Sequence, residues 1–537
     1  MKNIYSSFLL ACVLPIALGS CTKLHEKNFT EIVSSDFNPT EGDLGALVGS
    51  AYANWRPLYG HDNGFFSVQE ETSDEWVVPA RPNGWVDGGI FKRMHQHTWT
   101  VDDEYAAFNW SNAYNGVTNC NRIIYQIEAD IIPVQAGKEA LIAELRALRA
   151  SYYYTLIDNF GNIPIITKFD LPEGFLPEQS NRKEVYAFII KELTESLPLL
   201  SEAADKSTYG RFNKWAAHAL LAKMYLNATV YAGQEEWDKC IASCDAVIQS
   251  GNYLLEDNRK NIFVTNNENS KEIIFAIPYD EIYAGGFFIH MQSLHTSSYL
   301  TYNMQVMTWG GGGAVPQFIN TYDHEDARLK DDWMQGQQFA ANGDPLECVY
   351  GAFKGQPLVL INSVPSIDST AEFHAFRAAK YEYKMGTLFD LSNDVPLLRY
   401  ADVLMMKAEC LLRKGLSGEA AELVTDIRKR SFKDNPGKAQ VTGAQLLQGS
   451  SYVYGRSKND VIAPVEGGSD VKYGRFLDEL GWEFAQEARR RQDMVRFGVF
   501  TAKSWLSHQP NGSYRSLFPI PQQELNKNIN LSQNTGY

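Results

Sequence analysis

Two segments of this chain place an indole ring among planar polar side chains and residues that bend the backbone. One runs Arg81-Pro82-Asn83-Gly84-Trp85-Val86-Asp87, and the other joins Tyr302-Asn303 to Met307-Thr308-Trp309-Gly310. Sugar rings have apolar faces that stack on aromatic rings, and their hydroxyl groups bond to amide, carboxylate and guanidinium groups. Since Gly and Pro leave Trp85 and Trp309 little local packing, we predict that both indoles contact a carbohydrate. The alternative for each is an anchor buried in the core. Polar candidates for the same site are Asp74, Asn83, Tyr302 and Arg377.

Common catalytic motifs are absent from the sequence. It contains no Gly-x-Ser-x-Gly elbow and no His-Glu-x-x-His helix, and no Gly-Lys-Ser/Thr follows the Gly310–Gly313 run. We therefore predict a binding protein that is not an enzyme and needs no cofactor, with a flexible reversal at Gly310–Gly313 that presents Trp309. Paired carboxylates such as Glu70 and Glu71 leave a surface glycoside hydrolase as an alternative, because its acid and base are defined by their separation in space.

Metal-ligand spacing is also missing. If residues 95–97 formed a strand, His95 and His97 would share a face simply because alternate residues of any strand do, and this alone does not indicate a metal site. Three acidic side chains lie close together but lack the spacing of an EF-hand: Asp323, Glu325 and Asp326. We predict no metal site.

The N-terminus has the pattern of an exported lipoprotein. Lys2 precedes an apolar run from Phe8 to Leu18, and Leu18-Gly19-Ser20-Cys21 then resembles a lipobox. We predict a signal peptide at residues 1–20, a lipidated Cys21 and a tether at 21–40; the alternative is an ordinary signal peptide with a chance cysteine. Each buried methylene contributes about 0.8 kcal/mol, so two or three acyl chains would anchor the protein firmly in a membrane.

The charge and the cysteine content of the chain disfavour some classes of binding partner. The formal net charge is −15 at pH 7, which disfavours nucleic acid and anionic headgroups but not an uncharged ligand. Of the seven cysteines, five follow residue 21, and their spacing matches no zinc pattern. Cys240 and Cys244 lie one helical turn apart, which predicts buried thiols.

Apolar residues at helical spacing predict a mainly α-helical body at residues 41–537. The pairs Lys214–Ala228 with Glu236–Ser250, and Pro396–Lys414 with Gly418–Arg430, resemble tetratricopeptide helix pairs and must stack to bury their faces. We expect a scaffold at about 100–255 and 396–500, and a closing segment at 501–537. Gly, Asn, Asp and aromatic residues dominate about 56–100 and 256–395, which predicts a loop-rich ligand face with short strands such as Ile273–Ile277.

Several segments together resemble the SusD/RagB family of outer-membrane nutrient-binding lipoproteins. The most specific is the C-terminal pattern, from Leu517-Phe518-Pro519-Ile520-Pro521 to Gly536-Tyr537. The others are a charged segment at Glu483 to Gly498, a helix at Leu398 to Glu409, and a helix followed by a turn at Arg146 to Pro164. We expect all four to be scaffold, with Arg489, Arg490 and Arg491 salt-bridged on a helix face.

The resemblance implies a role in nutrient capture. Family members bind oligosaccharides outside the cell and act as a lid on a SusC-type TonB-dependent transporter, and in resembling proteins the region around Trp85 lines the glycan site. We therefore expect a lipid-anchored protein at the outer membrane, facing the exterior, with a glycan and a transporter as partners. Within the wider family, a scaffold for peptide or protein nutrients is a further alternative.

Overall fold

The computed structural model describes residues 40–537. The predicted signal peptide, Cys21 and all of the tether except Thr40 lie outside this range. Within it, no helix combines the length and the apolar character needed to cross a membrane.

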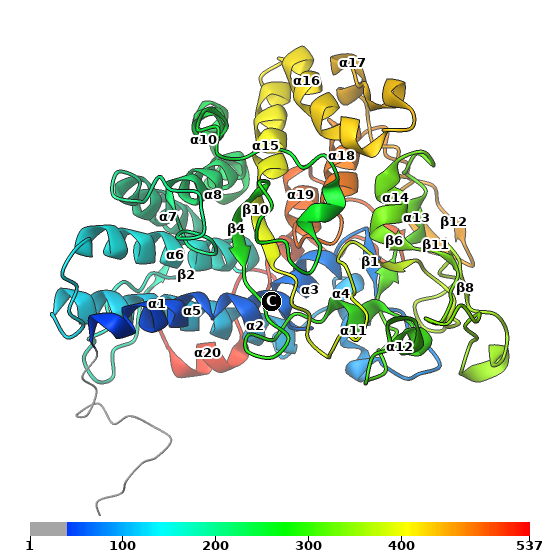
Figure 1. The fold of residues 1–537 in the computed structure, drawn as a ribbon, viewed down its shortest axis with the longest axis horizontal. Helices are drawn as coiled ribbons and strands as arrows, with labels where there is room; N and C mark the ends of the chain where they lie inside the picture. The colour runs from blue at the N-terminus through cyan, green and yellow to red at the C-terminus, as the bar shows by residue number, and fades with distance from the viewer. Residues whose placement is uncertain (1–39) are drawn as a thin grey trace, which may run out of the picture.

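Helices packed one on the next form a continuous stack, which confirms the predicted mainly α-helical fold (Figure 1). Each helix packs on the next in the order α5, α6, α7, α8, α10, α15, α16. Their bounds are α5 (Glu104–Glu128), α6 (Lys138–Asn159), α7 (Arg182–Ser196), α8 (Lys214–Leu226), α10 (Trp237–Gln249), α15 (Tyr400–Arg413) and α16 (Ser417–Arg428). The contact between α10 and α15 joins the two predicted tetratricopeptide-like pairs, which are far apart in the sequence. Each pair therefore buries a face against the other, as stacked repeats do.

A short two-stranded sheet leads directly into the second tetratricopeptide-like helix pair, α15 and α16. Strand β4 (Ile273–Ile277) pairs antiparallel with β10 (Val395–Arg399), and α15 begins directly afterwards at Tyr400. The prediction of a helix from Pro396 was therefore wrong for its first four residues. Proline favours an extended preceding residue and donates no hydrogen bond, so it fits the register shift beside it better than a helix interior.

The loop-rich regions are built from short elements on the right of Figure 1. Their strands are β1 (Trp76–Val77), β5 (Gly313–Ala314), β6 (Trp333–Met334), β7 (Gly336–Gln337), β8 (Val359–Leu360) and β9 (Arg377–Ala378). They pair antiparallel as β1 with β5, β6 with β9 and β7 with β8. Short helices lie among them: α3 (Phe65–Glu70), α4 (Ile90–His95), α11 (Ile289–Ser293), α12 (Tyr299–Tyr302), α13 (Pro316–Ile319) and α14 (Ala327–Asp332).

The charged segment before the C-terminus is buried. Helix α18 (Gly474–Phe484) contributes Glu483 and helix α19 (Arg490–Arg496) contributes Arg496 to a network of ion pairs inside the protein, and Arg489, directly before α19, adds a third charge. The predicted salt bridges are present, but they lie in the interior and not on a helix surface. Leaving any one of these charges unpaired would cost several kcal/mol, so the network acts as scaffold.

The C-terminal coil packs onto α6 at the end of that helix. The Asn534 amide donates to the carbonyls of Phe160 and Phe518, at 2.9 and 2.8 Å. The Tyr537 hydroxyl donates to the carbonyl of Leu517. These hydrogen bonds from Asn534 and Tyr537 attach the C-terminal coil to the end of α6 and hold the coil's own segments together.

Candidate carbohydrate site

The two predicted indoles meet at one surface. The ring centroids of Trp85 and Trp309 are 5.2 Å apart, with their planes inclined by 55°. Both side chains are half-buried, and the Asn83 amide donates to the carbonyl of Trp309, which ties the two loops together. Residues 224 positions apart (309 − 85) therefore form a single aromatic surface, which we call the platform.

Trp85 is held in place from three sides. Its ring lies against the backbone at Gly311, where a Cβ atom would fall 2.0 Å from the indole carbon Cε3. The indole Nε1 donates to the carboxylate of Asp87 at 3.0 Å, and the Phe91 ring makes an edge contact at 4.6 Å. Trp85 therefore rests on protein at the Gly311 backbone and is held in one orientation, while part of its surface remains accessible to solvent.

Trp309 has a similar support. Its backbone N–H donates to the carbonyl of Met291 at 2.8 Å, and its ring contacts Phe288 at 5.7 Å and Phe389 at 5.8 Å. Phe389 is 41% exposed and extends the platform beyond the two predicted indoles. We did not predict Phe389 from the sequence, because a single Phe between Leu388 and Asp390 has no local pattern that separates it from a core residue.

Tyr302 lies at the edge of the platform. It ends α12, and its ring is half-buried and meets Tyr383 edge-on at 5.6 Å. The apolar cluster beneath it includes Phe288 and Met304, with Trp309 packed against the same cluster. Tyr302 and Asn83 therefore lie with the indoles, as a shared site requires.

Asp74 and Arg377 are enclosed by protein and are not part of the platform, so both predictions of a ligand-contacting side chain were wrong. Asp74 is fully buried, pairs with Arg490 at 2.6 Å and accepts from the Tyr454 hydroxyl. Arg377 is also fully buried, and its guanidinium donates to the carbonyls of Gly311, Gly312 and Glu372. Burial lowers the pKa of Arg377 to about 9. Because Arg377 fixes the glycine backbone that supports Trp85, its role is to position the platform.

The Gly310–Gly313 run is held in place by hydrogen bonds, so the prediction of a flexible reversal was wrong. The N–H groups of Gly311 and Gly312 both donate to the carbonyl of Gln292, and Gly313 belongs to β5. A Cβ atom at Gly312 would fall 2.3 Å from the ring of Trp76. These glycines therefore allow close packing of two indoles, and they do not act as a hinge.

The other residues considered for chemistry are enclosed. Glu70 and Glu71 are both buried, so a polysaccharide has no access to this pair of carboxylates. His95 ends the helix α4 and His97 follows it; both are buried, and neither lies on a strand. The acidic trio pairs with cations: Asp323 and Glu325 with Lys438, and Asp326 with Arg328. No metal-binding group of three or more His, Cys, Asp or Glu side chains occurs within residues 40–537.

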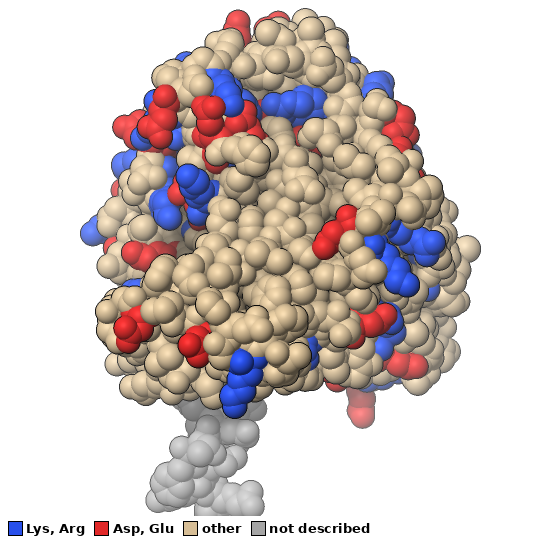
Figure 2. Space-filling view, turned by 90° about the vertical axis from the view of Figure 1, so that its right-hand side faces the viewer, with Lys and Arg blue, Asp and Glu red and all other residues tan. Residues whose placement is uncertain are grey.

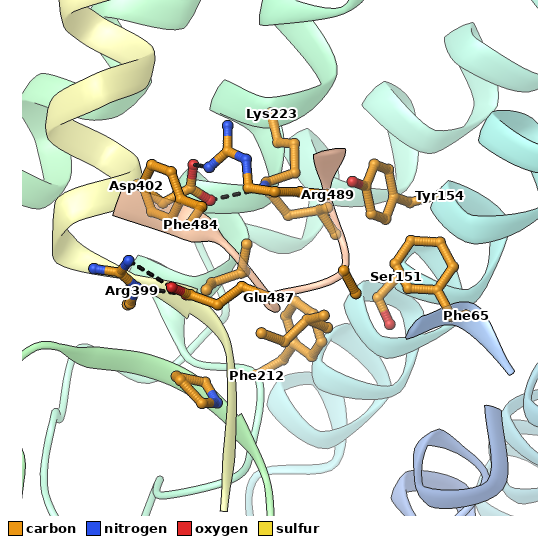
Figure 3. Close-up of a pocket in the computed structure, with 15 residues that line it drawn as sticks. Phe65, Ser151, Tyr154, Phe212, Lys223, Arg399, Asp402, Phe484, Glu487 and Arg489 are labelled. Atoms are coloured by element: carbon orange, nitrogen blue, oxygen red, sulfur yellow. Dashed lines mark hydrogen bonds and ion pairs between the residues drawn. The ribbon is translucent and has the colours of Figure 1, made fainter. Parts of the chain in front are cut away.

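The cavity in Figure 3 lies inside the ion-pair network, away from the platform. Its volume is about 20 Å³, room for about one water molecule. Arg489 and Lys223 both pair with Asp402, the latter at 2.7 Å, and Arg399 pairs with Glu487 (Figure 3). Burial opposes the ionised form of Asp402, yet the two cations lower its pKa below the ordinary value. This space is part of the scaffold, and none of the platform residues lines it.

Two family models match most of the chain. One, described as starch-binding and associating with the outer membrane, matches residues 34–226. The other, the SusD family, matches residues 271–537. The protein belongs to the SusD/RagB family. The family resemblance expected from the C-terminal pattern and the helical segments is therefore confirmed; Trp85 lies within the first matched range and Trp309 within the second.

Similar proteins include glycan binders. The starch-binding protein SusD of Bacteroides thetaiotaomicron is 26% identical over 522 residues, with 88% of this chain and 85% of that protein covered. SusD-like protein P25 of Formosa agariphila is 22% identical, covering 96% and 97%. Surface glycan-binding protein A from Bacteroides thetaiotaomicron, solved with laminarihexaose, shares the SusD/RagB fold with a TM-score of 0.67 and 19% identity, covering 92% and 99%.

Proposed function

We propose that this protein binds a glycan through the platform without cleaving it. The observation that carries the proposal is the half-exposed pair of indoles, Trp85 and Trp309, supported by bare glycine backbone. Stacking removes the apolar face of a sugar ring from water, and at about 25 cal/mol per Å² this contributes roughly 1–2 kcal/mol per indole. Named starch-binding and laminarihexaose-binding relatives support the same ligand class.

The proposed setting is the outside of the outer membrane. In this proposal Cys21 carries the lipid anchor, and the body delivers its glycan to a SusC-like TonB-dependent transporter. Support comes from the lipobox Leu18-Gly19-Ser20-Cys21 and from a family described as associating with the outer membrane.

Binding and cleavage are separated by one experiment. The purified protein is run in native gels that contain single polysaccharides, with starch, laminarin, xylan, pectin and mannan in parallel lanes and a plain gel as reference. We expect retardation by at least one polysaccharide, and no new reducing ends after incubation with it. Equal mobility in every gel would refute glycan binding, and new reducing ends would show the hydrolase that was the sequence-based alternative.

A further inference from the structure

A trough lined by apolar surface and a few polar groups lies beside the platform. Its volume is about 500 Å³, which is within the ~300–1,000 Å³ typical of small-molecule sites. Leu300 and Ala341 supply apolar surface, and Asn303, Asn342 and Asp344 supply hydrogen-bonding groups. We call these five residues and the space between them the trough.

The trough and the platform share the helix α12. Tyr302 ends that helix at the platform edge, and the next residue, Asn303, lines the trough. Two hydrogen bonds fix the opposite wall to the helix: the Thr301 hydroxyl donates to the carbonyl of Phe339 at 2.7 Å, and the Ala341 N–H donates to the carbonyl of Leu300 at 3.0 Å. Tyr302 and Asn303 are neighbours in the chain, so the platform edge and the trough are adjacent.

The hydrogen-bonding groups of the trough are ordered before any ligand arrives. The Asn342 amide donates to Asp344 Oδ2 at 2.7 Å, and the Asp344 N–H donates to Asn342 Oδ1 at 3.1 Å. This arrangement leaves the second carboxylate oxygen and one amide hydrogen for other partners, and both side chains are exposed. A rigid pair of planar polar groups loses little conformational entropy on binding.

The carboxylates of Asp344 and Glu347 line the trough, and both can accept hydrogen bonds from sugar hydroxyl groups. The segment from β7 to β8, which forms one trough wall, lies on the right-hand side of Figure 1. Seen from that side in Figure 2, the face has its charged side chains mainly towards the margins and a broad uncharged centre. Exposed apolar side chains from the same segment include Phe339 and Val349.

We infer that the trough is a second subsite for the same glycan chain. The platform stacks on the faces of one or two sugar rings, and the trough reads the hydroxyl groups of the rings that follow. Asn342 and Asp344 are its specificity-determining pair, because together they offer a donor and an acceptor at a defined spacing. This inference rests on the proposed function and adds a length requirement to it.

The test is a chain-length series. The polysaccharide that retards the wild-type protein most in native gels is cut into oligosaccharides of two to eight residues, and each is titrated by isothermal calorimetry. We expect the affinity to rise about tenfold or more between the shortest bound oligosaccharide and the longest. Asn342→Ala with Asp344→Ala removes the pair, and Ala341→Phe adds bulk to the trough lining while keeping both residues of the pair. In each variant the ratio of long-chain to short-chain affinity should fall below about threefold.

Ala136→Phe is the matched control, because Ala136 is also an exposed alanine in a loop and is remote in sequence from the trough. It should keep the wild-type ratio. A wild-type affinity that does not change with chain length, or trough variants that keep the full ratio, would overturn the inference while leaving the proposed function intact. Failure of every oligosaccharide and polysaccharide to bind would overturn both.

Discussion

The ring of Trp85 rests directly on the backbone of Gly311, a residue 226 positions later in the chain (311 − 85). The nearest ring atoms lie 2.0 and 2.1 Å from the place where a Cβ would stand, closer than any real Cβ contact. The platform therefore depends on the absence of one side chain as much as on the presence of two indoles.

Gly311→Ala should weaken glycan binding although it touches no ligand. The new methyl group would force Trp85 off its support, and overpacking of this kind costs about 1–3 kcal/mol. We expect at least a tenfold loss of affinity by calorimetry and a changed tryptophan signal in near-ultraviolet circular dichroism. Gly418→Ala is the control, because a Cβ there meets nothing within 4 Å, and it should leave both unchanged. Wild-type affinity in Gly311→Ala would show that the position of Trp85 does not matter.

Trp85→Ala and Trp309→Ala should each weaken binding by about ten- to thirtyfold, the equivalent of roughly 1–2 kcal/mol. Because neither ring is fully buried, the melting temperature of each variant should stay close to that of the wild type. Trp333→Ala is the contrasting variant, since Trp333 is fully buried and its loss should cost roughly 3–5 kcal/mol of folding stability. A large drop in melting temperature for the platform variants, with the affinity of the folded fraction intact, would make these indoles core anchors.

The buried carboxyl group of Glu71 should make the free energy of unfolding fall as the pH rises. Burial raises the pKa of Glu71 to about 8, above the ordinary value of 4.5; a hydrogen bond from Tyr105 opposes the shift, and the nearby charge of Asp62 adds to it. Between pH 4.5 and 8 the native state therefore holds a proton on Glu71 that the unfolded chain has released. The contribution of protonated Glu71 to the free energy of unfolding is complete below pH 4.5 and is lost as the pH rises through 8.

Urea unfolding at pH 5 and pH 7 measures this effect in the wild type and in Glu71→Gln, which keeps an acceptor for Tyr105. Other titrating groups are common to both proteins and cancel in the comparison. On going from pH 5 to pH 7, the wild type should lose about 2 kcal/mol more unfolding free energy than the variant. Identical pH dependence in the two proteins would contradict a protonated Glu71.

Cys21→Ala should abolish membrane anchoring. Without the thiol there is no site for the thioether lipid, so the protein should appear in the soluble or unprocessed fraction when the cells are fractionated. Labelling with a radioactive fatty acid provides a second readout and should mark only the wild type. If the variant stays with the outer membrane as strongly as the wild type, the proposed anchor is incorrect.

The wild-type lipoprotein should co-purify with a large β-barrel transporter. Mild detergent extraction, affinity capture through a C-terminal tag and mass spectrometry test this, with Cys21→Ala as the matched sample that lacks the anchor. Recovery of the lipoprotein alone, under conditions that keep other transporter complexes together, would argue against the proposed delivery step.

Local patterns were sufficient for much of the scaffold. The apolar stripes of α8, α10, α15 and α16 and the run at β4 are short-range features, because each arises from the period of a single element. The two indoles were likewise visible, since a Trp beside Gly or Pro lacks local packing partners. The exception was the start of α15, where pairing with β4, more than 120 residues earlier, overrides the helical stripe at Pro396.

The sequence by itself therefore determined the helical scaffold and the family, and it picked out two indoles that lie together in the structure, but not which polar residues accompany them. Asp74 and Asn83 look equally suitable in the sequence, yet Asp74 is paired with Arg490, 416 positions away, and Asn83 reaches the platform. Only the tertiary structure separated them, and only it added Phe389 and the support at Gly311. The physical reason is that burial and charge pairing are set by contacts between distant segments, whereas the periodicity of a helix or strand is set by its immediate neighbours.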